Sequence, residues 1–182
     1  MTCIQNQPED FATSALAGFS SIYARYVRPV RSGVVRSTAT PDGKVAVVVG
    51  GGSGHYPAFA GFVGPGMADA AVAGDVFASP SAHGVAHVCR MAHRGGGILL
   101  GFGNYAGDVM NFGLAGERLA SEGIDVRIVH VTDDVASAPA DQPAKRRGVA
   151  GDLNGFKIAG AAAEAGLNLD EVERVARKTN AR

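Results

Sequence analysis

A short apolar run rich in β-branched residues, at positions 44–49, ends abruptly in the glycine-rich segment 50–57. A run of this length and composition is typical of a buried strand. The same order recurs at 98–102, a second candidate for a buried strand, which is followed by the polar segment 103–108. Because glycine lets the backbone approach a neighbour closely, these segments constrain both the fold and the place where a ligand would lie.

Helical patterns lie between the expected strands. We expect extended segments at 70–77 and 125–131, and helices at 11–26, 82–93 (capped by Ser81), 109–121 (ended by Gly123), 153–165 and 169–179. This alternation predicts an α/β fold, a layered sheet with helices on both faces. We expect a single α/β domain over residues 1–182, with a polar surface loop at 132–151.

Composition argues against several classes of function. Lys+Arg and Asp+Glu each number 17, so no basic excess favours nucleic acid or an anionic membrane as a partner. No apolar run approaches the roughly 18 residues that span a bilayer, and the first ten residues lack the basic and apolar regions of a signal peptide. The two cysteines, Cys3 and Cys89, form no CxxC pair. We therefore expect a soluble, cytoplasmic protein without a nucleic-acid or membrane partner.

His55 and Asp108 each follow one of the two best strand candidates. In open α/β sheets, ligands bind beyond the carboxyl ends of the strands, which is where both residues are expected. If the two strands are neighbours, the two side chains face one crevice. With an ordinary pKa of about 6.5, histidine is the usual general acid or base near neutral pH.

The segment 50–57 fits neither of two common glycine-rich motifs. A P-loop needs Lys and then Ser or Thr after its last glycine, whereas His55 and Tyr56 follow Gly54. A nucleophile elbow needs GxSxG, whereas the sequence here is GGSGH. Two interpretations remain, a backbone cradle for a small polar ligand beside His55, or a tight structural turn with a capping histidine.

The second segment leaves alternatives open as well. Residues 101–106 (GFGNYA) formally match the dinucleotide-binding pattern GxGxxG/A, with Asp133 near the place of the acidic partner. Asp108 lies near an expected helix start, where the helix dipole alone favours a carboxylate.

The other histidines are expected to have no role in a site. His83 and His87 are four residues apart on one expected helix, but Cys89 lies off their face and no carboxylate completes a zinc set, so we expect no metal. His130 lies inside an expected strand, and the basic run 145–147 is typical of a solvated loop.

Several short segments recur here in the order and spacing of a known family: GGGSGH at 50–55, Pro57, Gly64-x-Gly66, Phe77-x-Ser79-Pro80, Asn104-Tyr105-x-Gly107-Asp108, Asn111-Phe112, Asp133-Asp134-Val135 and Arg146-Arg147-Gly148. Over nearly its whole length the chain resembles the N-terminal α/β domain of the K subunit of the dihydroxyacetone kinase family. The resemblance implies part of a ketose kinase, which phosphorylates a terminal hydroxyl of dihydroxyacetone or of a tetrulose such as erythrulose.

The resemblance also implies roles for particular residues. Gly52, Ser53 and Gly54 are similar to the backbone cradle for the ketose hydroxyls, and His55 to its acid/base group. Asp108 resembles the carboxylate that accepts a hydrogen bond from the reacting hydroxyl. In the family, a histidine in the second half of the subunit binds the substrate carbonyl covalently, and this chain ends before that point.

The family's phosphoryl donor, ATP or ADP with Mg²⁺, sits on a separate L domain or partner subunit. We therefore expect no cofactor in this chain, no kinase activity from this chain alone, and a homodimer in the full-length form.

Two positions depart from the dihydroxyacetone-specific members, Tyr56 in place of Glu and Gly103 in place of a substrate-contacting Lys. Removing a long cationic side chain is expected to leave space beside Gly103, and erythrulose-acting relatives look more like this version. Two other functions stay open, a nucleotide-binding oxidoreductase domain that uses GFGNYA, and a non-catalytic module that senses a ketose.

Overall fold

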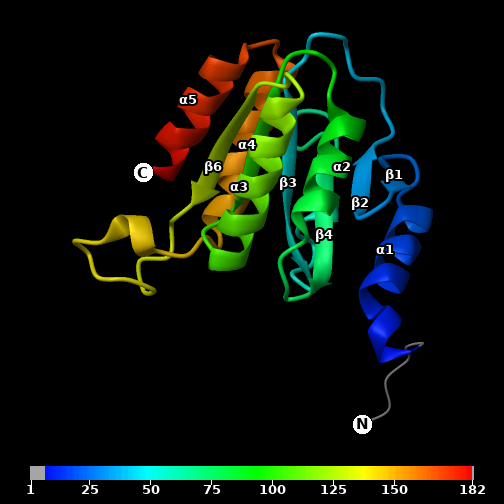
Figure 1. Cartoon of the computed structure of the whole chain (residues 1–182), viewed down its shortest axis with the longest axis horizontal. Helices are drawn as coiled ribbons and strands as arrows, with labels where there is room; N and C mark the ends of the chain where they lie inside the picture. The colour runs from blue at the N-terminus through cyan, green and yellow to red at the C-terminus, as the bar shows by residue number, and fades with distance from the viewer. Residues whose placement is uncertain (1–6, 182) are drawn as a thin grey trace.

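A six-stranded mixed sheet forms the centre of the computed structural model, which describes residues 7–181 (Figure 1). The strands, in their order across the sheet, are β1 (Val27–Val30), β2 (Gly33–Arg36), β4 (Ala70–Val76), β3 (Ala46–Ser53), β5 (Ile98–Gly103) and β6 (Val126–Val131). Strands β4, β3, β5 and β6 run parallel, whereas β1 and β2 form an antiparallel hairpin beside β4. The central strands β3 and β5 are direct neighbours, as the site prediction requires.

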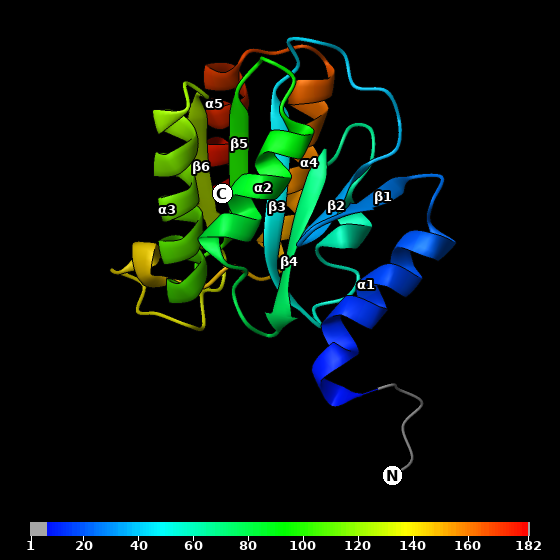
Figure 2. The same cartoon turned by 45° about the vertical axis from the view of Figure 1, so that its right-hand side comes forward.

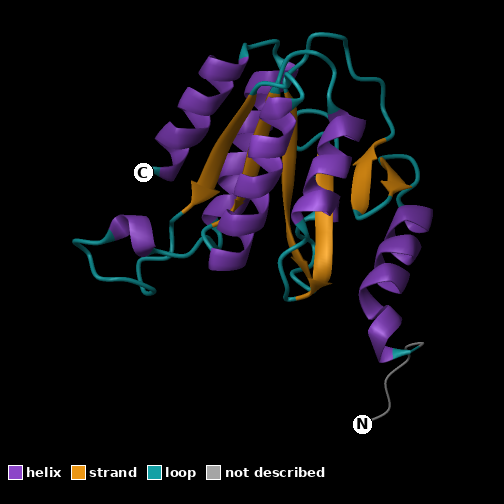
Figure 3. Cartoon of the chain, in the orientation of Figure 1, coloured by secondary structure: helices purple, strands orange, loops and turns teal. Residues whose placement is uncertain are grey.

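Helices cover both faces of the sheet (Figures 1 and 3). They are α1 (Phe11–Ile22), α2 (Ala82–Ala92), α3 (Ala106–Ser121), α4 (Gly151–Glu164) and α5 (Leu169–Asn180). Helices α2 and α3 pack on one face, α4 and α5 on the other, which confirms the predicted α/β class. Within residues 7–181, no helix is long and apolar enough to cross a membrane.

The pattern of β3 explains these two layers. Val47 and Val49 contribute to the core beneath α4 and α5, whereas Ala46 and Val48 contribute to the core beneath α2 and α3. All four are buried, because a central parallel strand is covered on both faces and therefore carries a continuous apolar run. This is why the short run at 44–49 predicted a buried strand correctly.

Several predicted boundaries were wrong. The first helix ends at Ile22, and β3 continues to Ser53, so the first glycines belong to the strand and not to a loop. Helix α3 begins at Ala106, which places Asp108 inside its first turn. The hairpin of β1 and β2 was not predicted. By contrast, Ser81 caps α2 as expected, since its Oγ accepts a hydrogen bond from the Gly84 N–H.

A buried network of charges ties the amino ends of the parallel strands to β2 and α4. Asp69, which is 2% exposed, accepts hydrogen bonds from Lys44 Nζ at 2.7 Å and Arg36 Nη1 at 3.0 Å. Arg36 also donates to Glu164 at the end of α4, at 2.7 Å. The Asp69 carboxylate further accepts the Val47 N–H at 2.9 Å. The Asp69 carboxylate therefore joins β2 to β3, and Arg36 extends the network to α4. This network lies at the opposite end of the sheet from His55 and Asp108.

Replacing Asp69 should destabilise the fold strongly. In Asp69→Ala, the buried cations Lys44 and Arg36 lose their shared partner, and breaking such a buried pair costs about 3–5 kcal/mol. Denaturant unfolding followed by circular dichroism measures the loss. Asp170→Ala is the matched control, because Asp170 pairs with Arg127 at the surface, where its side chain is 82% exposed and the loss should be much smaller. Equal losses in the two variants would contradict the structural role of Asp69.

Candidate functional site

The carboxyl ends of β3, β4 and β5 meet at one edge of the sheet (Figure 2). The chain passes from β3 to β4 on one side and later returns to β5 on the other side of β3. Ligands of open α/β sheets bind at such a switch point, beyond the carboxyl ends of the strands. The segments that follow these three strands therefore make up the candidate site.

The end of β3 has no room for side chains. A Cβ on Gly50 would lie 2.8 Å from the Val72 carbonyl oxygen, and one on Gly52 would lie 2.6 Å from the Ala78 backbone nitrogen. Ser53 Oγ then donates a hydrogen bond to the Gly74 carbonyl at 2.7 Å, which fastens the end of β3 to β4. The glycines bring the chain after β4 directly against the end of β3, and Gly54 turns the chain with a φ of 102°.

His55 stands exposed beyond this turn, between two aromatic rings. Its imidazole meets the Phe77 ring edge to face, with 4.8 Å between ring centroids, and the Phe59 ring at 6.2 Å. The two phenyl rings restrict the orientation of the imidazole without taking its nitrogen atoms, so these stay available to a ligand.

Asp108 is buried in the first turn of α3, at 8% exposure, and its Oδ1 has no hydrogen-bond partner. Burial raises the pKa of its carboxyl, while Ser79 and the charge of His55 act in the opposite direction. His55 and Asp108 follow the neighbouring strands β3 and β5, and the charge of His55 acts on the Asp108 carboxyl. Asn111 Nδ2 donates to Ser79 Oγ at 3.3 Å and so holds Ser79 in place.

Gly103 ends β5, and the space beside it is not empty. A Cβ on Gly103 would lie 2.9 Å from the Tyr105 ring and 3.2 Å from the Gly148 carbonyl oxygen. The expectation of free space at this position was wrong, because the Tyr105 ring fills it. The Tyr105 hydroxyl donates to the same Gly148 carbonyl at 3.1 Å, which keeps the ring there.

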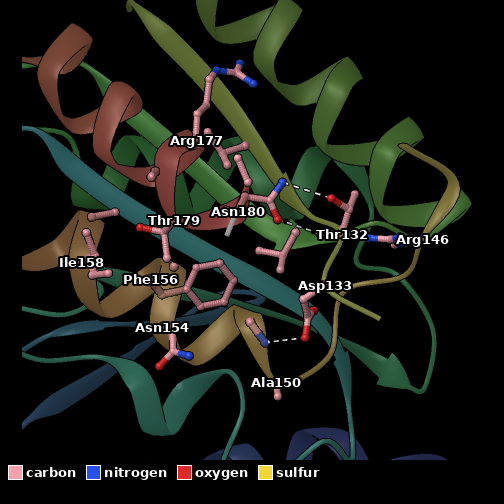
Figure 4. Close-up of a pocket in the computed structure, with 18 of the residues that line it drawn as sticks. Thr132, Asp133, Arg146, Ala150, Asn154, Phe156, Ile158, Arg177, Thr179 and Asn180 are labelled. Atoms are coloured by element: carbon pink, nitrogen blue, oxygen red, sulfur yellow. Dashed lines mark hydrogen bonds between the residues drawn. The ribbon is translucent and has the colours of Figure 1, made fainter. Parts of the chain in front are cut away.

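The loop at 132–151 folds back over the end of β5. Asn104 Nδ2 donates to the carbonyl oxygens of Ala144 at 3.0 Å and Arg146 at 2.8 Å. The Asp133 carboxylate accepts the N–H groups of Val149 at 2.7 Å and Gly151 at 2.8 Å, at the start of α4. Figure 4 shows Asp133 beside this helix start. Because Asp133 caps this helix, its carboxylate is not free for a ribose, which argues against the dinucleotide interpretation of GFGNYA.

Asp152 is a second buried carboxyl that the sequence did not reveal. It lies in the first turn of α4, is 8% exposed, and its Oδ1 has no hydrogen-bond partner. Burial raises its pKa to about 7, helped by the neighbouring carboxylates of Asp133 and Asp108. Its only signal in the sequence was a carboxylate at a helix start, which is common and says nothing of burial.

The remaining candidates lie outside this group. Within residues 7–181, no cluster of His, Cys, Asp and Glu could hold a metal ion, and His83 is exposed on α2. Burial raises the pKa of the Cys89 thiol to about 12, so it is not reactive, and burial lowers the pKa of His130.

A cavity of about 950 Å³ lies between the sheet, α4 and α5 (Figure 4). Arg146, Asn154 and Asn180 line it together with apolar core residues. It contains neither of the predicted acid/base residues, so size alone does not mark the candidate site.

The fold agrees with comparisons to known proteins. The family model described as the Dak1 domain matches residues 17–182. This chain belongs to the Dak1 domain family. It is 60% identical over 180 residues to an L-erythrulose 1-kinase of Mycolicibacterium smegmatis, covering 99% of this chain and 32% of the relative. It is also 59% identical over 181 residues to a D-erythrulose kinase of the same organism, covering 100% of this chain and 31% of the relative.

A solved structure shows the same fold. The dihydroxyacetone kinase from C. freundii, in complex with AMP-PNP and Mg²⁺, superimposes with a TM-score of 0.87 at 38% identity. The match covers 97% of this chain and 33% of that structure. The Dak1 chain thus spans less than half the length of these relatives, and none of the three is an oxidoreductase by name.

The buried carboxyl of Asp152 should leave a signature in the pH dependence of stability. Its pKa is about 7 in the folded chain against an ordinary value of 3.8, so the folded form holds a proton between these values that the unfolded form has lost. Stability from this group is therefore complete at low pH and falls as pH rises from about 4 to about 7. The melting temperature of the wild type should drop, relative to Asp152→Asn, across this window.

The control for this measurement is Asp141→Asn, which removes an exposed carboxylate from the loop that precedes α4. Its melting curves should follow those of the wild type at every pH. A constant difference between wild type and Asp152→Asn from pH 4 to 8 would mean that Asp152 is not protonated by burial.

Proposed function

We propose that this chain is the substrate-binding domain of a ketose kinase, which presents a terminal hydroxyl of erythrulose or dihydroxyacetone for phosphorylation. The observation that carries the proposal is the convergence of His55 and Asp108 at the carboxyl ends of β3 and β5, beside the closely packed glycines that end β3. The high identity to two erythrulose kinases supports the same conclusion.

In this proposal the ketose lies against Gly52, Ser53 and Gly54, whose backbone meets its hydroxyls, with Gly103 on the β5 side. Asp108 accepts the hydrogen bond of the reacting hydroxyl. Because burial raises the pKa of Asp108, its carboxylate is a stronger base than one in water and takes up the proton more readily as the hydroxyl attacks. His55, held by Phe77 and Phe59, serves as the second acid/base group at the same hydroxyl.

The phosphoryl donor is expected outside this chain. A dihydroxyacetone kinase of the same fold binds AMP-PNP and Mg²⁺, but this chain spans only 33% of that protein. We therefore assign ATP, or ADP as a phosphoryl carrier, and Mg²⁺ to an L-type domain or partner subunit. We also propose that the complete protein is cytoplasmic and forms a homodimer.

Ketose binding is the direct test of the substrate-binding role. Titration of the ¹⁵N-labelled chain with L-erythrulose, D-erythrulose or dihydroxyacetone should move the backbone amide signals of Gly52, Gly54 and Asp108. Glycerol, which lacks the carbonyl but carries similar hydroxyls, is the matched control ligand and should bind more weakly. If no ketose moves these signals at millimolar concentrations, the proposed function is wrong.

Turnover tests the two acid/base residues. The chimera carries this chain in place of the matching segment of the L-erythrulose 1-kinase of Mycolicibacterium smegmatis. In it, His55→Asn or Asp108→Asn should reduce kcat for erythrulose by at least roughly 100-fold, because positioned acid/base groups contribute on the order of 10²–10⁴ to the rate. A coupled assay for ADP measures the rate, and the 182-residue chain with ATP alone should give no product.

The matched control in the chimera is His93→Asn, because His93 lies at the end of α2, just before the amino end of β5, and so at the edge of the sheet opposite the candidate site. It should keep normal turnover. Near-normal rates in folded His55→Asn and Asp108→Asn chimeras would refute the assignment of these two residues.

A further inference from the structure

Phe77 directly follows β4 and combines two unusual properties. Its backbone has a φ of 50°, in the left-handed region that bulky residues rarely adopt. Its side chain is 69% exposed, so burial in the core does not explain why a large apolar residue stands there. Glycine or asparagine would suit this backbone better. A bulky residue that is kept in a strained conformation at the edge of a candidate site indicates a function for its side chain.

Close contacts keep the Phe77 backbone in this conformation. The Phe77 N–H donates a hydrogen bond to the Ser53 carbonyl oxygen at 2.9 Å. A Cβ on Gly52 would lie 2.8 Å from the Phe77 Cα, so the two backbones touch. Ser53 Oγ also donates to the Gly74 carbonyl oxygen at 2.7 Å. The segment around Phe77 is therefore fastened to the end of β3 at two points.

The phenyl ring of Phe77 lies against both the turn at Gly54 and His55. A Cβ on Gly54 would lie 3.1 Å from this ring. The centroids of the phenyl and imidazole rings are 4.8 Å apart, with 77° between the ring planes, which is a favourable edge-to-face contact. Phe59 is the more distant ring, at 6.2 Å from the imidazole, and it also packs against Phe156 in the core. Phe77 is thus the nearer of the two rings and the one that the core does not need.

We propose that Phe77 is a positioning residue, whose strained backbone holds its ring against His55 and so directs the imidazole towards the reacting hydroxyl of the ketose. This inference rests on the proposed function and refines it. The imidazole is exposed, so without the ring it can turn among several rotamers in water. A general acid or base must lie within hydrogen-bond reach of its proton, and a misplacement of about 1 Å can lower a rate roughly 100-fold. The Phe77 ring therefore contributes to the rate of turnover and little to the stability of the fold.

The test measures kcat and KM for erythrulose in the chimera described above. Phe77→Gly removes the ring and suits a positive φ, whereas Phe77→Tyr keeps the ring. Phe77→Gly should reduce kcat roughly tenfold or more, with KM changed less than about threefold, and Phe77→Tyr should keep the wild-type rate. In a chimera that already carries His55→Asn, Phe77→Gly should lower the residual kcat less than about twofold further, because the ring acts through His55.

Ser32→Gly is the matched control for the relief of backbone strain. Within residues 7–181, Ser32 is the other non-glycine residue with a positive φ, 65°, and it lies in the turn between β1 and β2. Ser32→Gly should keep the wild-type kcat. Both glycine variants of the 182-residue chain should melt close to the wild type in circular dichroism, because glycine adopts a positive φ without strain.

The combined variant separates a positioning role from a structural one. The inference is wrong if folded Phe77→Gly keeps a normal kcat, if Phe77→Tyr loses as much rate as Phe77→Gly, or if the losses from Phe77→Gly and His55→Asn are independent. In these cases the proposed function stands. If His55→Asn alone keeps a normal rate, the proposed role of His55 fails and the inference with it. Should Phe77→Gly not fold, Phe77→Asn takes its place with the same expected outcomes, because asparagine also tolerates the left-handed region.

Discussion

The carboxyl end of β3 carries no side chains from Gly50 to Gly52, and the candidate site depends on this. With any Cβ there, the strand would collide with Val72, with the Phe59 ring or with the backbone of Ala78. Because Gly50 to Gly52 have no side chains, the chain after β4 can fold against the end of β3. This brings Phe77 to His55 and Ser79 to Asp108. The glycines are therefore important because they let the segment after β4 pack closely against β3, and less because their backbone is flexible.

Sequence periodicity predicted the layers of the fold because a central parallel strand must be apolar on both faces. It failed at the ends of elements. Glycines at the end of β3 resemble a loop, although they pair with β4 as a strand. The hairpin of β1 and β2 was missed because Pro29 and the flanking arginines hide any alternation of apolar and polar residues.

The candidate site was predictable only in part, for a similar reason. His55 and Asp108 follow strands that pair directly, so their proximity could be inferred from chain order and parallel topology. The Tyr105 ring over Gly103, and the burial of Asp152, depend on Gly148, which lies more than 40 residues beyond Gly103. No local sequence pattern predicts such contacts, because they depend on the path of the loop at 132–151.

The ion network of Asp69 lies at the amino ends of the parallel strands, whereas the candidate site lies at their carboxyl ends. The charges that hold the sheet together and the charges proposed to act on substrate are therefore separated by the length of a strand. Mutations that reshape the substrate edge leave this anchor untouched, and interactions of distant sites are usually additive. Such a layout lets the residues of the candidate site change while the same framework persists.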